Sequence, residues 1–350
     1  MKFSDAIVQE DMRTLRECGL PIENLRGRHV LITGASGMLA AYMVYFFEYL
    51  NRTEDYGIHV TALVRNEEKA WKKFGEFRDD PDFELLVQDV CTPVERKWEH
   101  LDFIIHAAGN ASPQFILNDP VGIINANTTG TMNVMELAKD YRARVLYTST
   151  REVYGKMDET LISIREDSFG ALDPMERRSC YPESKRVAES ILQGYHFQYG
   201  VESVVARIAH SYGPGMIIDN DGRVMSDFIS DVVHGRDIVM KSTGDAVRAF
   251  CYITDAISAL LTLLLKGKAG EAYNVANETE PVPIREAAQM LVSLFPERGL
   301  KVVFDIPEEM SQGYSKMGRV ALDTGKLEAL GWKPSVSLKD GMKRTVESFQ

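Results

Sequence analysis

The segment VLITGASGMLAAYMV, residues 30–44, constrains the fold more than any other stretch of the chain. A buried apolar run leads to Gly34 and a helical pattern begins after Gly37, so the two glycines occupy a tight strand-to-helix turn. With Ala40 they form a G-x-x-G-x-x-A pattern, in which glycine lets a pyrophosphate approach the free N–H groups of a helix N-terminus. The pattern predicts a dinucleotide site, and the alternative is a tight turn without a ligand. The contacts predicted at this turn are Gly34, Ser36, Gly37, Met38 and Leu39.

The first half of the chain alternates apolar runs of strand length with amphipathic runs of helix length. This alternation is typical of a parallel sheet with helices on both faces, so we predict an α/β fold, a Rossmann-type doubly wound parallel sheet. After about residue 214, shorter pieces punctuated by Gly and Pro predict a smaller mixed α/β lobe that returns segments to the main sheet. The predicted strands span residues 29–35, 59–65, 83–90, 101–109, 144–151 and 201–213, and the main helices span residues 122–141 and 181–200. The predicted domains are an N-terminal helical arm (1–27), a dinucleotide-binding domain (28–213) and a mainly substrate-binding lobe (214–350).

Two further segments refine the dinucleotide site. Asp89 and Val90 close the third predicted strand, where a carboxylate that contacts adenine is expected. The second strand ends in ALVRNEE, which places Arg65 where NAD-binding chains carry an acidic residue for the ribose 2′-hydroxyl. A guanidinium at this position can bind a 2′-phosphate, which favours NADP. If Arg65 instead points to solvent or stacks on adenine, NAD remains acceptable. The remaining predicted cofactor contacts are Ala107, Ala108, Gly109, Asn127, Tyr181 and Lys185.

A tyrosine and a lysine form the predicted catalytic pair. Tyr181 and Lys185 lie four residues apart in SCYPESKRVAES, on one helix face, and Pro182 suits the first turn of that helix. The lysine ammonium and a positive nicotinamide are expected to lower the pKa of the phenol toward working pH. The tyrosine can then exchange a proton with a sugar hydroxyl while hydride moves. This spacing is common by chance, but it is specific downstream of a glycine-rich turn and a HAAG strand end.

With these motifs the chain resembles the extended short-chain dehydrogenase/reductases of the NAD-dependent epimerase/dehydratase family, which act on nucleotide sugars. The resemblance covers roughly residues 28–345. The combination of HAAGNASP, SYGPGM followed by DGRV, and RAFCYITD is most similar to UDP-glucuronate decarboxylases, followed by dTDP-glucose 4,6-dehydratases. The other motifs that carry it are TGASGMLA, STREVYG, CYPESK, ARIAHSYGPGM, YNVAN and LGWKP.

The resemblance also assigns residues to the substrate, a nucleotide-diphosphate sugar. It implies that Thr150 hydrogen-bonds the reacting sugar hydroxyl beside Tyr181, and that arginines hold the diphosphate or the nearby ribose. His210 stands where the family often has an asparagine near the diphosphate. The alternatives are surface solvation for the arginines and a core or loop position for His210. The assigned substrate residues are Ser112, His210, Arg223, Arg248 and Arg319, and the assigned catalytic residues are Thr150, Arg151, Glu152, Tyr181 and Lys185.

Arg151 departs from the family pattern. Where the 4,6-dehydratases have Thr-Asp-Glu and the decarboxylases Thr-Ser-Glu, this chain reads Thr150-Arg151-Glu152. A guanidinium, with a pKa above about 12, cannot donate the proton that expels water from the sugar, so 6-deoxysugar formation is disfavoured. The cation could position a departing carboxylate, or Arg151 could turn away and form a salt bridge with Glu152 or Glu183.

Three functions remain open at this point. The first is hydride transfer at a secondary carbon of a nucleotide sugar, C4 above all, as in decarboxylases, dehydratases and epimerases that supply surface polysaccharide precursors. The second is net NADPH-dependent reduction of a nucleotide-linked keto sugar, such as a CDP-ketose to a CDP-alditol. The third is a non-catalytic dinucleotide sensor, which the presence of both Tyr181 and Lys185 disfavours.

Charge and composition narrow the partners. The net charge of -11, with no Lys/Arg block, disfavours nucleic acid. The N-terminus lacks the continuous apolar core of a signal peptide, and the apolar runs elsewhere are far short of a membrane span. We therefore expect a cytoplasmic protein without a membrane or nucleic-acid partner. Four scattered cysteines without a CxxC pair predict reduced thiols and no metal site. The family commonly forms homodimers through the two main helices, and the residues here that could face a partner or the core are Met132, Met135, Ile191 and Phe197.

Overall fold

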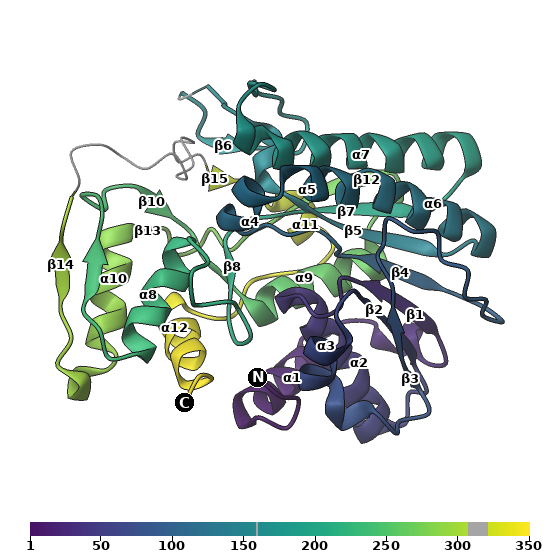
Figure 1. Ribbon diagram of the computed structural model, residues 1–350, viewed down its shortest axis with the longest axis horizontal. Helices are drawn as coiled ribbons and strands as arrows, with labels where there is room; N and C mark the ends of the chain where they lie inside the picture. The colour runs from purple at the N-terminus through teal and green to yellow at the C-terminus, as the bar shows by residue number, and fades with distance from the viewer. Residues whose placement is uncertain (159, 307–320) are drawn as a thin grey trace.

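A seven-stranded sheet forms the centre of this computed structural model, which describes residues 1–158, 160–306 and 321–350. All its strands are parallel, in the order β12-β7-β5-β4-β1-β2-β3 (Figure 1). The order reverses between β1 and β4, and ligands of such sheets bind outside the carboxyl ends of the strands at this switch point. The predicted doubly wound fold is therefore confirmed. The strands are β1 (His29–Thr33), β2 (His59–Val64), β3 (Phe83–Val87), β4 (Phe103–His106), β5 (Arg144–Thr150), β7 (Ser203–Ile208) and β12 (Glu271–Val275).

Two hydrophobic cores lie on opposite faces of this sheet, because successive side chains of a strand point to opposite sides. In β1, Val30 and Ile32 pack with α2 and α9, whereas Leu31 packs with α6 and α7. Helices α5, α6 and α7 cover one face and α2 and α9 the other (Figure 1). These helices are α2 (Met38–Glu54), α5 (Pro120–Asn127), α6 (Thr129–Tyr141), α7 (Cys180–Tyr199) and α9 (Ile253–Lys266), and the shorter α3 (Glu67–Phe74) and α4 (Pro113–Asn118) follow β2 and β4.

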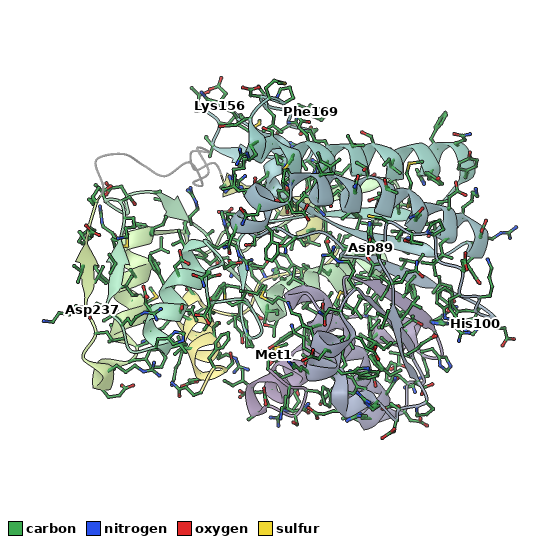
Figure 2. All side chains as sticks on the ribbon, viewed as in Figure 1. Met1, Asp89, His100, Lys156, Phe169 and Asp237 are labelled. Atoms are coloured by element: carbon green, nitrogen blue, oxygen red, sulfur yellow. The ribbon has the colours of Figure 1, made fainter. Side chains whose placement is uncertain are left out.

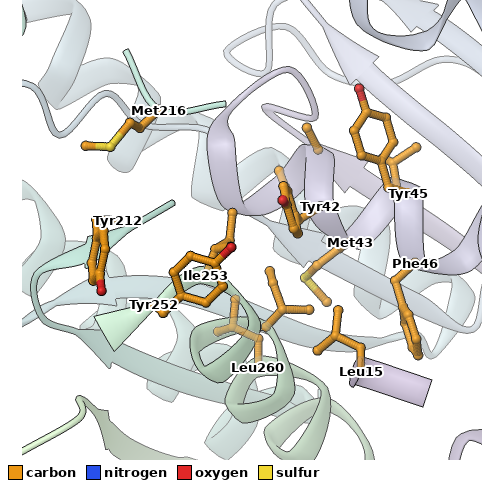
Figure 3. Close-up of a cluster of buried hydrophobic side chains, with 14 of the residues drawn as sticks. Leu15, Tyr42, Met43, Tyr45, Phe46, Tyr212, Met216, Tyr252, Ile253 and Leu260 are labelled. Carbon is orange, nitrogen blue, oxygen red and sulfur yellow. The ribbon is translucent and has the colours of Figure 1, made fainter. Parts of the chain in front are cut away.

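The residues before β1 form helix α1 (Ala6–Glu17) and a short 3-10 turn. Leu15 of α1 belongs to the same buried cluster as Met43 of α2 and Leu260 of α9 (Figure 3). The arm is thus part of the core on that face of the sheet.

Much of the chain after β7 builds a layer of helices and short strands at one end of the molecule, whereas α11 (Gly325–Glu328) packs against β12 of the central sheet (Figure 1). The helices of this layer are α8 (Val224–Val233), α10 (Ile284–Ser293) and α12 (Leu338–Glu347). The short strands pair as β8 (Ser211–Tyr212) with β11 (Cys251–Tyr252), β9 (Ile238–Met240) with β14 (Val302–Phe304), β10 (Val247–Arg248) with β13 (Val282–Pro283), and β6 (Ser163–Ile164) with β15 (Ala321–Leu322). In the described residues, no helix combines the length and the apolar character that a membrane crossing requires.

Two predicted elements are interrupted. The strand predicted over residues 201–213 is divided into β7 and β8, because His210 has a φ of 47°, in the left-handed region, and cannot continue a strand. The helix predicted over residues 122–141 is divided into α5 and α6 at Thr128. The hydroxyls of Thr128 and Thr131 donate to the carbonyl oxygens of Ile124 and Asn127, at 2.7 and 2.6 Å, and such bonds bend helices.

Candidate active site

The turn after β1 has the conformation that only glycine adopts readily. Gly34 has a φ of 64°, and a Cβ there would lie 2.7 Å from the Ala107 carbonyl oxygen and 2.8 Å from the Ala108 Cα. Glycine therefore lets the turn after β1 touch the end of β4. The N–H of Gly37, the N-cap of α2, donates to the Gly34 carbonyl at 2.9 Å and closes the turn.

The end of β4 connects this turn to the catalytic helix. A Cβ at Gly109 would lie 2.7 Å from Asn127 Oδ1 and 3.4 Å from Lys185 Nζ. Asn127 is fully buried, and its Nδ2 donates to Ser184 Oγ at 2.9 Å. Its Oδ1 has no hydrogen-bond partner among the described residues. The glycine turn, β4 and Lys185 of α7 therefore meet at one place, which we call the carboxyl-edge site; Thr150, Tyr181 and His210 also belong to it.

This arrangement fits a dinucleotide. Gly34 and Gly37 place no side chain at the N-terminus of α2, whose free N–H groups suit a pyrophosphate, and the buried Asn127 Oδ1 is an acceptor without a donor among the described residues. The residues that would hold the dinucleotide are Gly34, Ser36, Gly37, Met38, Leu39, Ala107, Ala108, Gly109 and Asn127.

Arg65 and Asp89 lie at the adenine end of the predicted site. Arg65 Nη1 is 3.8 Å from Asp89 Oδ2, and both side chains are exposed. Asp89 Oδ1 accepts the Cys91 N–H at 2.8 Å, and Val90 beside it is buried against α6. Figure 2 places Asp89 near the middle of the molecule, whereas His100 and Asp237 lie at opposite edges of the same view.

Tyr181 and Lys185 lie on the buried side of α7, with 5% and 3% of their surfaces exposed. The Tyr181 hydroxyl lies near the side chain of Thr150, at the end of β5, which acts to lower the pKa of the phenol. Lys185 Nζ donates to the Thr148 carbonyl at 2.7 Å and lies 4.5 Å from the centre of the Tyr147 ring. Strand β5 and helix α7 thus bring the predicted Thr150, Tyr181 and Lys185 together.

The pKa shifts of Tyr181 and Lys185 differ from those that the sequence predicted. Burial, and then the charge of Glu152, raise the pKa of Tyr181, although the Thr150 side chain and the charges of Arg178 and Arg223 act in the opposite direction. Burial lowers the pKa of Lys185 to about 7. The protein groups alone therefore do not bring the phenol pKa toward neutrality, because desolvation exceeds the favourable charges.

Glu152 has a partner that the sequence reasoning missed. Its carboxylate receives both Nη1 and, at 3.1 Å, Nη2 of Arg178, and both side chains are about four-fifths buried. Glu183 in turn lies 3.7 Å from Arg186. Arg178 follows another arginine in MERRSC, and nothing in that pattern separates it from a surface charge.

Arg151 contacts a histidine. Its Nη1 is 3.0 Å from Nε2 of His210, and it forms no ion pair among the described residues. Its Nε and Nη2 are buried without a hydrogen-bond partner in that part of the chain. The alternative in which Arg151 pairs with Glu152 or Glu183 is therefore wrong, because those carboxylates bind Arg178 and Arg186.

The other predicted substrate residues lie in the same region, with one exception. Ser112 Oγ donates to the Asp221 carbonyl at 3.0 Å, and Arg223 pairs with the Asp221 carboxylate. Arg223 lowers the pKa of Tyr181, and Arg248 lowers that of His210, so both cations act on the carboxyl-edge site. Arg319 lies outside the described residues.

Comparison with known proteins identifies the family. Residues 30–276 match the model of the NAD dependent epimerase/dehydratase family. The chain belongs to this family. It is 34% identical to UDP-glucuronic acid decarboxylase 6 of Arabidopsis thaliana over 323 residues, which cover 92% of this chain and 88% of that protein. Membership makes it an enzyme of the NAD(P)-dependent short-chain dehydrogenase/reductase type, as the motifs predicted.

Solved structures agree on the fold. DesIV, a dTDP-glucose 4,6-dehydratase from Streptomyces venezuelae solved with NAD and TYD, is 24% identical and superposes with a TM-score of 0.75 over 92% of this chain and 96% of its own. UDP-glucuronic acid 4-epimerase from Bacillus cereus, solved with UDP-glucuronic acid and NAD, is 21% identical with the same TM-score, over 92% and 98%. At these identities the likeness establishes the α/β fold of the family.

Proposed function

We propose that this chain transfers hydride at C4 of a UDP-linked hexuronate and releases its carboxylate as CO2. The observation that carries the proposal is the meeting of Thr150, Tyr181 and Lys185 with the glycine turn, through Gly109, at the carboxyl-edge site. The relatives named as UDP-glucuronic acid decarboxylases, at up to 34% identity, support this substrate. They give no support to a net reductase.

The proposed roles follow from the contacts. Tyr181 takes the C4 hydroxyl proton, and Thr150, whose side chain lies beside it, aligns that hydroxyl. Lys185, fixed by the Thr148 carbonyl, is charged only below about pH 7. A bound NAD(P) would supply the hydride acceptor and donor for C4, and the positive charge of its ring would favour the Tyr181 tyrosinate that the protein groups alone disfavour.

Arg151 is compatible with decarboxylation and not with water loss. Oxidation at C4 places a ketone β to the carboxylate, so the bond from C5 to the carboxylate carbon breaks as CO2 leaves, and the enolate takes a proton at C5. No general acid is needed to expel a hydroxyl in this sequence. Burial lowers the pKa of Arg151, and the charges of Glu278 and Glu152 oppose this shift. Because the ordinary pKa of a guanidinium is above about 12, Arg151 remains a cation. It therefore cannot donate the proton with which a dehydratase expels water.

Incubation with UDP-glucuronate and NAD tests the proposal. We expect a product lighter by about 44 Da in the mass spectrum, and a 340 nm absorbance that does not change at steady state. UDP-glucose under the same conditions is the control and should return unchanged. Unaltered UDP-glucuronate contradicts the proposal, and consumption of NADPH in step with product formation would indicate a net reductase instead.

We also propose a homodimer through α5, α6 and α7. Phe197 of α7 is 93% exposed and Met132 of α6 is 50% exposed, whereas Met135 is fully buried in the core. Ile191 is partly buried against the same core. Sedimentation of the wild type and of Met132→Glu/Phe197→Glu tests this: a dimer that becomes a monomer supports it, and an unchanged mass contradicts it.

A further inference from the structure

Arg151 and His210 follow two neighbouring strands of the central sheet, β5 and β7. β5 and β7 are paired so that Thr150 lies opposite Ile208, and each contact residue follows one of these positions at the carboxyl edge. Arg151 begins the 3-10 turn after β5, and His210 lies between β7 and β8. Their 3.0 Å contact therefore lies beside Thr150, whose side chain acts on the Tyr181 hydroxyl.

The direction of this hydrogen bond is fixed by chemistry. A guanidinium only donates, so Nε2 of His210 must accept, and the ring is neutral with its proton on Nδ1. The pKa of His210 is lowered by the protein packed around it and by the charges of Arg151 and Arg248, which agrees with a neutral ring. Its Nδ1 has no partner among the described residues, and the residue is solvent-exposed.

A backbone hydrogen bond fixes the conformation of His210, and charged side chains surround its ring. Its left-handed φ of 47° is held because its carbonyl accepts the Cys251 N–H at 3.2 Å, where β8 pairs with β11. The Phe250 ring lies 6.0 Å away. Glu152 is paired with Arg178, and the positive charges of Arg151 and Arg248 both act on the imidazole, while Glu278 acts on Arg151.

We propose that Arg151 is a positioning residue, which holds His210 in the tautomer that offers Nδ1–H to an anionic oxygen of the substrate. That oxygen belongs to a carboxylate on the sugar or to the diphosphate. Arg151 itself does not meet the anion, because its Nε and Nη2 are buried whereas His210 is exposed. This assignment of the substrate contact rests on the proposed function, but the tautomer is a property of the free protein.

Histidine side-chain NMR of the full-length protein, without a sugar nucleotide, tests the tautomer. The His210 signals are identified from their absence in His210→Asn. We expect a neutral ring protonated on Nδ1 from pH 5 to 8 in the wild type, and a mixture of tautomers with a higher pKa in Arg151→Met. Arg165→Met, at an exposed arginine 3.7 Å from Asp167, is the control and should leave the signals unchanged. A wild-type ring protonated on Nε2, or identical spectra for Arg151→Met, overturns the proposal.

The anion is tested with simple probes in the same spectra. Inorganic pyrophosphate should shift the Nδ1 signal of the wild type if the diphosphate is the partner, and free glucuronate should shift it if the carboxylate is. The shift should require at least tenfold more of the probe in Arg151→Met. If neither probe shifts the signal, the anion contact is wrong, whether or not UDP-glucuronate is later found to be a substrate.

A double-mutant cycle separates positioning from direct contact. We measure the affinities for UDP, UDP-glucose and UDP-glucuronate calorimetrically. Arg151→Met should weaken binding about tenfold in the wild-type background and leave it unchanged in the His210→Asn background, because asparagine has no tautomer to fix. Weakening for all three ligands assigns the oxygen to the diphosphate, and weakening for UDP-glucuronate alone assigns it to the carboxylate. An equal loss in both backgrounds contradicts the positioning role.

Discussion

Two arginine-centred clusters of this protein differ in how completely their polar groups are bonded. At the junction of α1, α2, β11 and α12, buried Asp11 accepts Tyr42 and Tyr252 hydroxyls at 2.9 and 3.0 Å, and Arg344 Nη2 at 2.6 Å. Figure 3 shows both tyrosine rings in the hydrophobic cluster that encloses them. We call Asp11, Tyr42, Tyr252 and Arg344 the arm hub. At the carboxyl-edge site, by contrast, only Nη1 of Arg151 is hydrogen-bonded within the described part of the chain.

The difference separates structural from functional charge. Both oxygens of Asp11 accept hydrogen bonds within the protein, so the charges of the arm hub tie the arm to α12. Asn127 Oδ1, by contrast, is a buried acceptor that no described residue bonds, and Arg151 acts on its surroundings through the one nitrogen that contacts His210. Substitutions at the carboxyl-edge site should therefore change turnover and leave stability nearly intact, and substitutions in the arm hub should do the reverse.

The largest expected effect is that of Tyr181→Phe. Removal of the proton-transfer group should lower kcat by about 10²–10⁴-fold, with the melting temperature and UDP affinity nearly unchanged. Single-turnover conversion of UDP-glucuronate, followed by mass spectrometry, measures this. Tyr199→Phe, at an exposed tyrosine near the end of the same helix, is the matched control. Full turnover by Tyr181→Phe would remove Tyr181 from the catalytic role.

The arm hub gives the opposite expectation. Arg344→Met leaves the buried Asp11 carboxylate without its cation, so the free energy of unfolding should fall by about 3 kcal/mol. Turnover per folded molecule should stay within about twofold of the wild type. Denaturant unfolding measures the first quantity and titrated activity the second. Arg26→Met, at an exposed arginine paired with Glu23 on the surface, should change stability by less than about 0.5 kcal/mol. Equal losses in the two variants would show that the arm hub is not special.

Glu48 tests whether every unbonded buried group marks a function. It is fully buried on α2, both its oxygens lack a partner among the described residues, and burial raises its pKa to about 8. Met38, at the start of α2, lies at the carboxyl-edge site, and Glu48 lies about 15 Å further along the helix. Its carboxyl thus stays protonated in the folded state at pH 7, whereas the unfolded chain loses that proton near pH 4.5.

The sign of the Glu48 effect follows from this difference. The folded state binds more protons than the unfolded state between about pH 4.5 and 8, so this contribution to stability falls as pH rises, by at most about 1.4 kcal/mol per pH unit. Glu48→Gln should remove that slope and be about 4 kcal/mol more stable than the wild type at pH 8, with stability within about 1 kcal/mol at pH 5. Urea unfolding at the two pH values measures it. Parallel pH profiles would mean that Glu48 is not buried in its protonated form.

The sequence predicted the scaffold better than the contacts within the site. All six predicted strands exist, and α7 begins within one residue of its predicted start, because apolar periodicity and the glycine turn are local signals. The contact between Arg151 and His210, and that between Glu152 and Arg178, join residues 59 and 26 positions apart. Such contacts depend on the packing of β5 against β7 and on the turn before α7, which no local pattern records. His210 itself needed its left-handed φ to be recognised as the end of a strand.

The smallest expected effect concerns Arg65, which resembles neither cluster because it is exposed and loosely paired with Asp89. Arg65→Ala should weaken NADP binding about tenfold and leave NAD binding and stability nearly unchanged, because a surface pair at 3.8 Å contributes little to folding. Fluorescence titration with both cofactors measures this, with Arg96→Ala, at another exposed arginine, as the control. Unchanged NADP affinity would exclude a 2′-phosphate contact. In that case Asp89 would set the preference between NAD and NADP, because its carboxylate would repel a 2′-phosphate. Asp89→Asn should then bind NADP more tightly in the same titration.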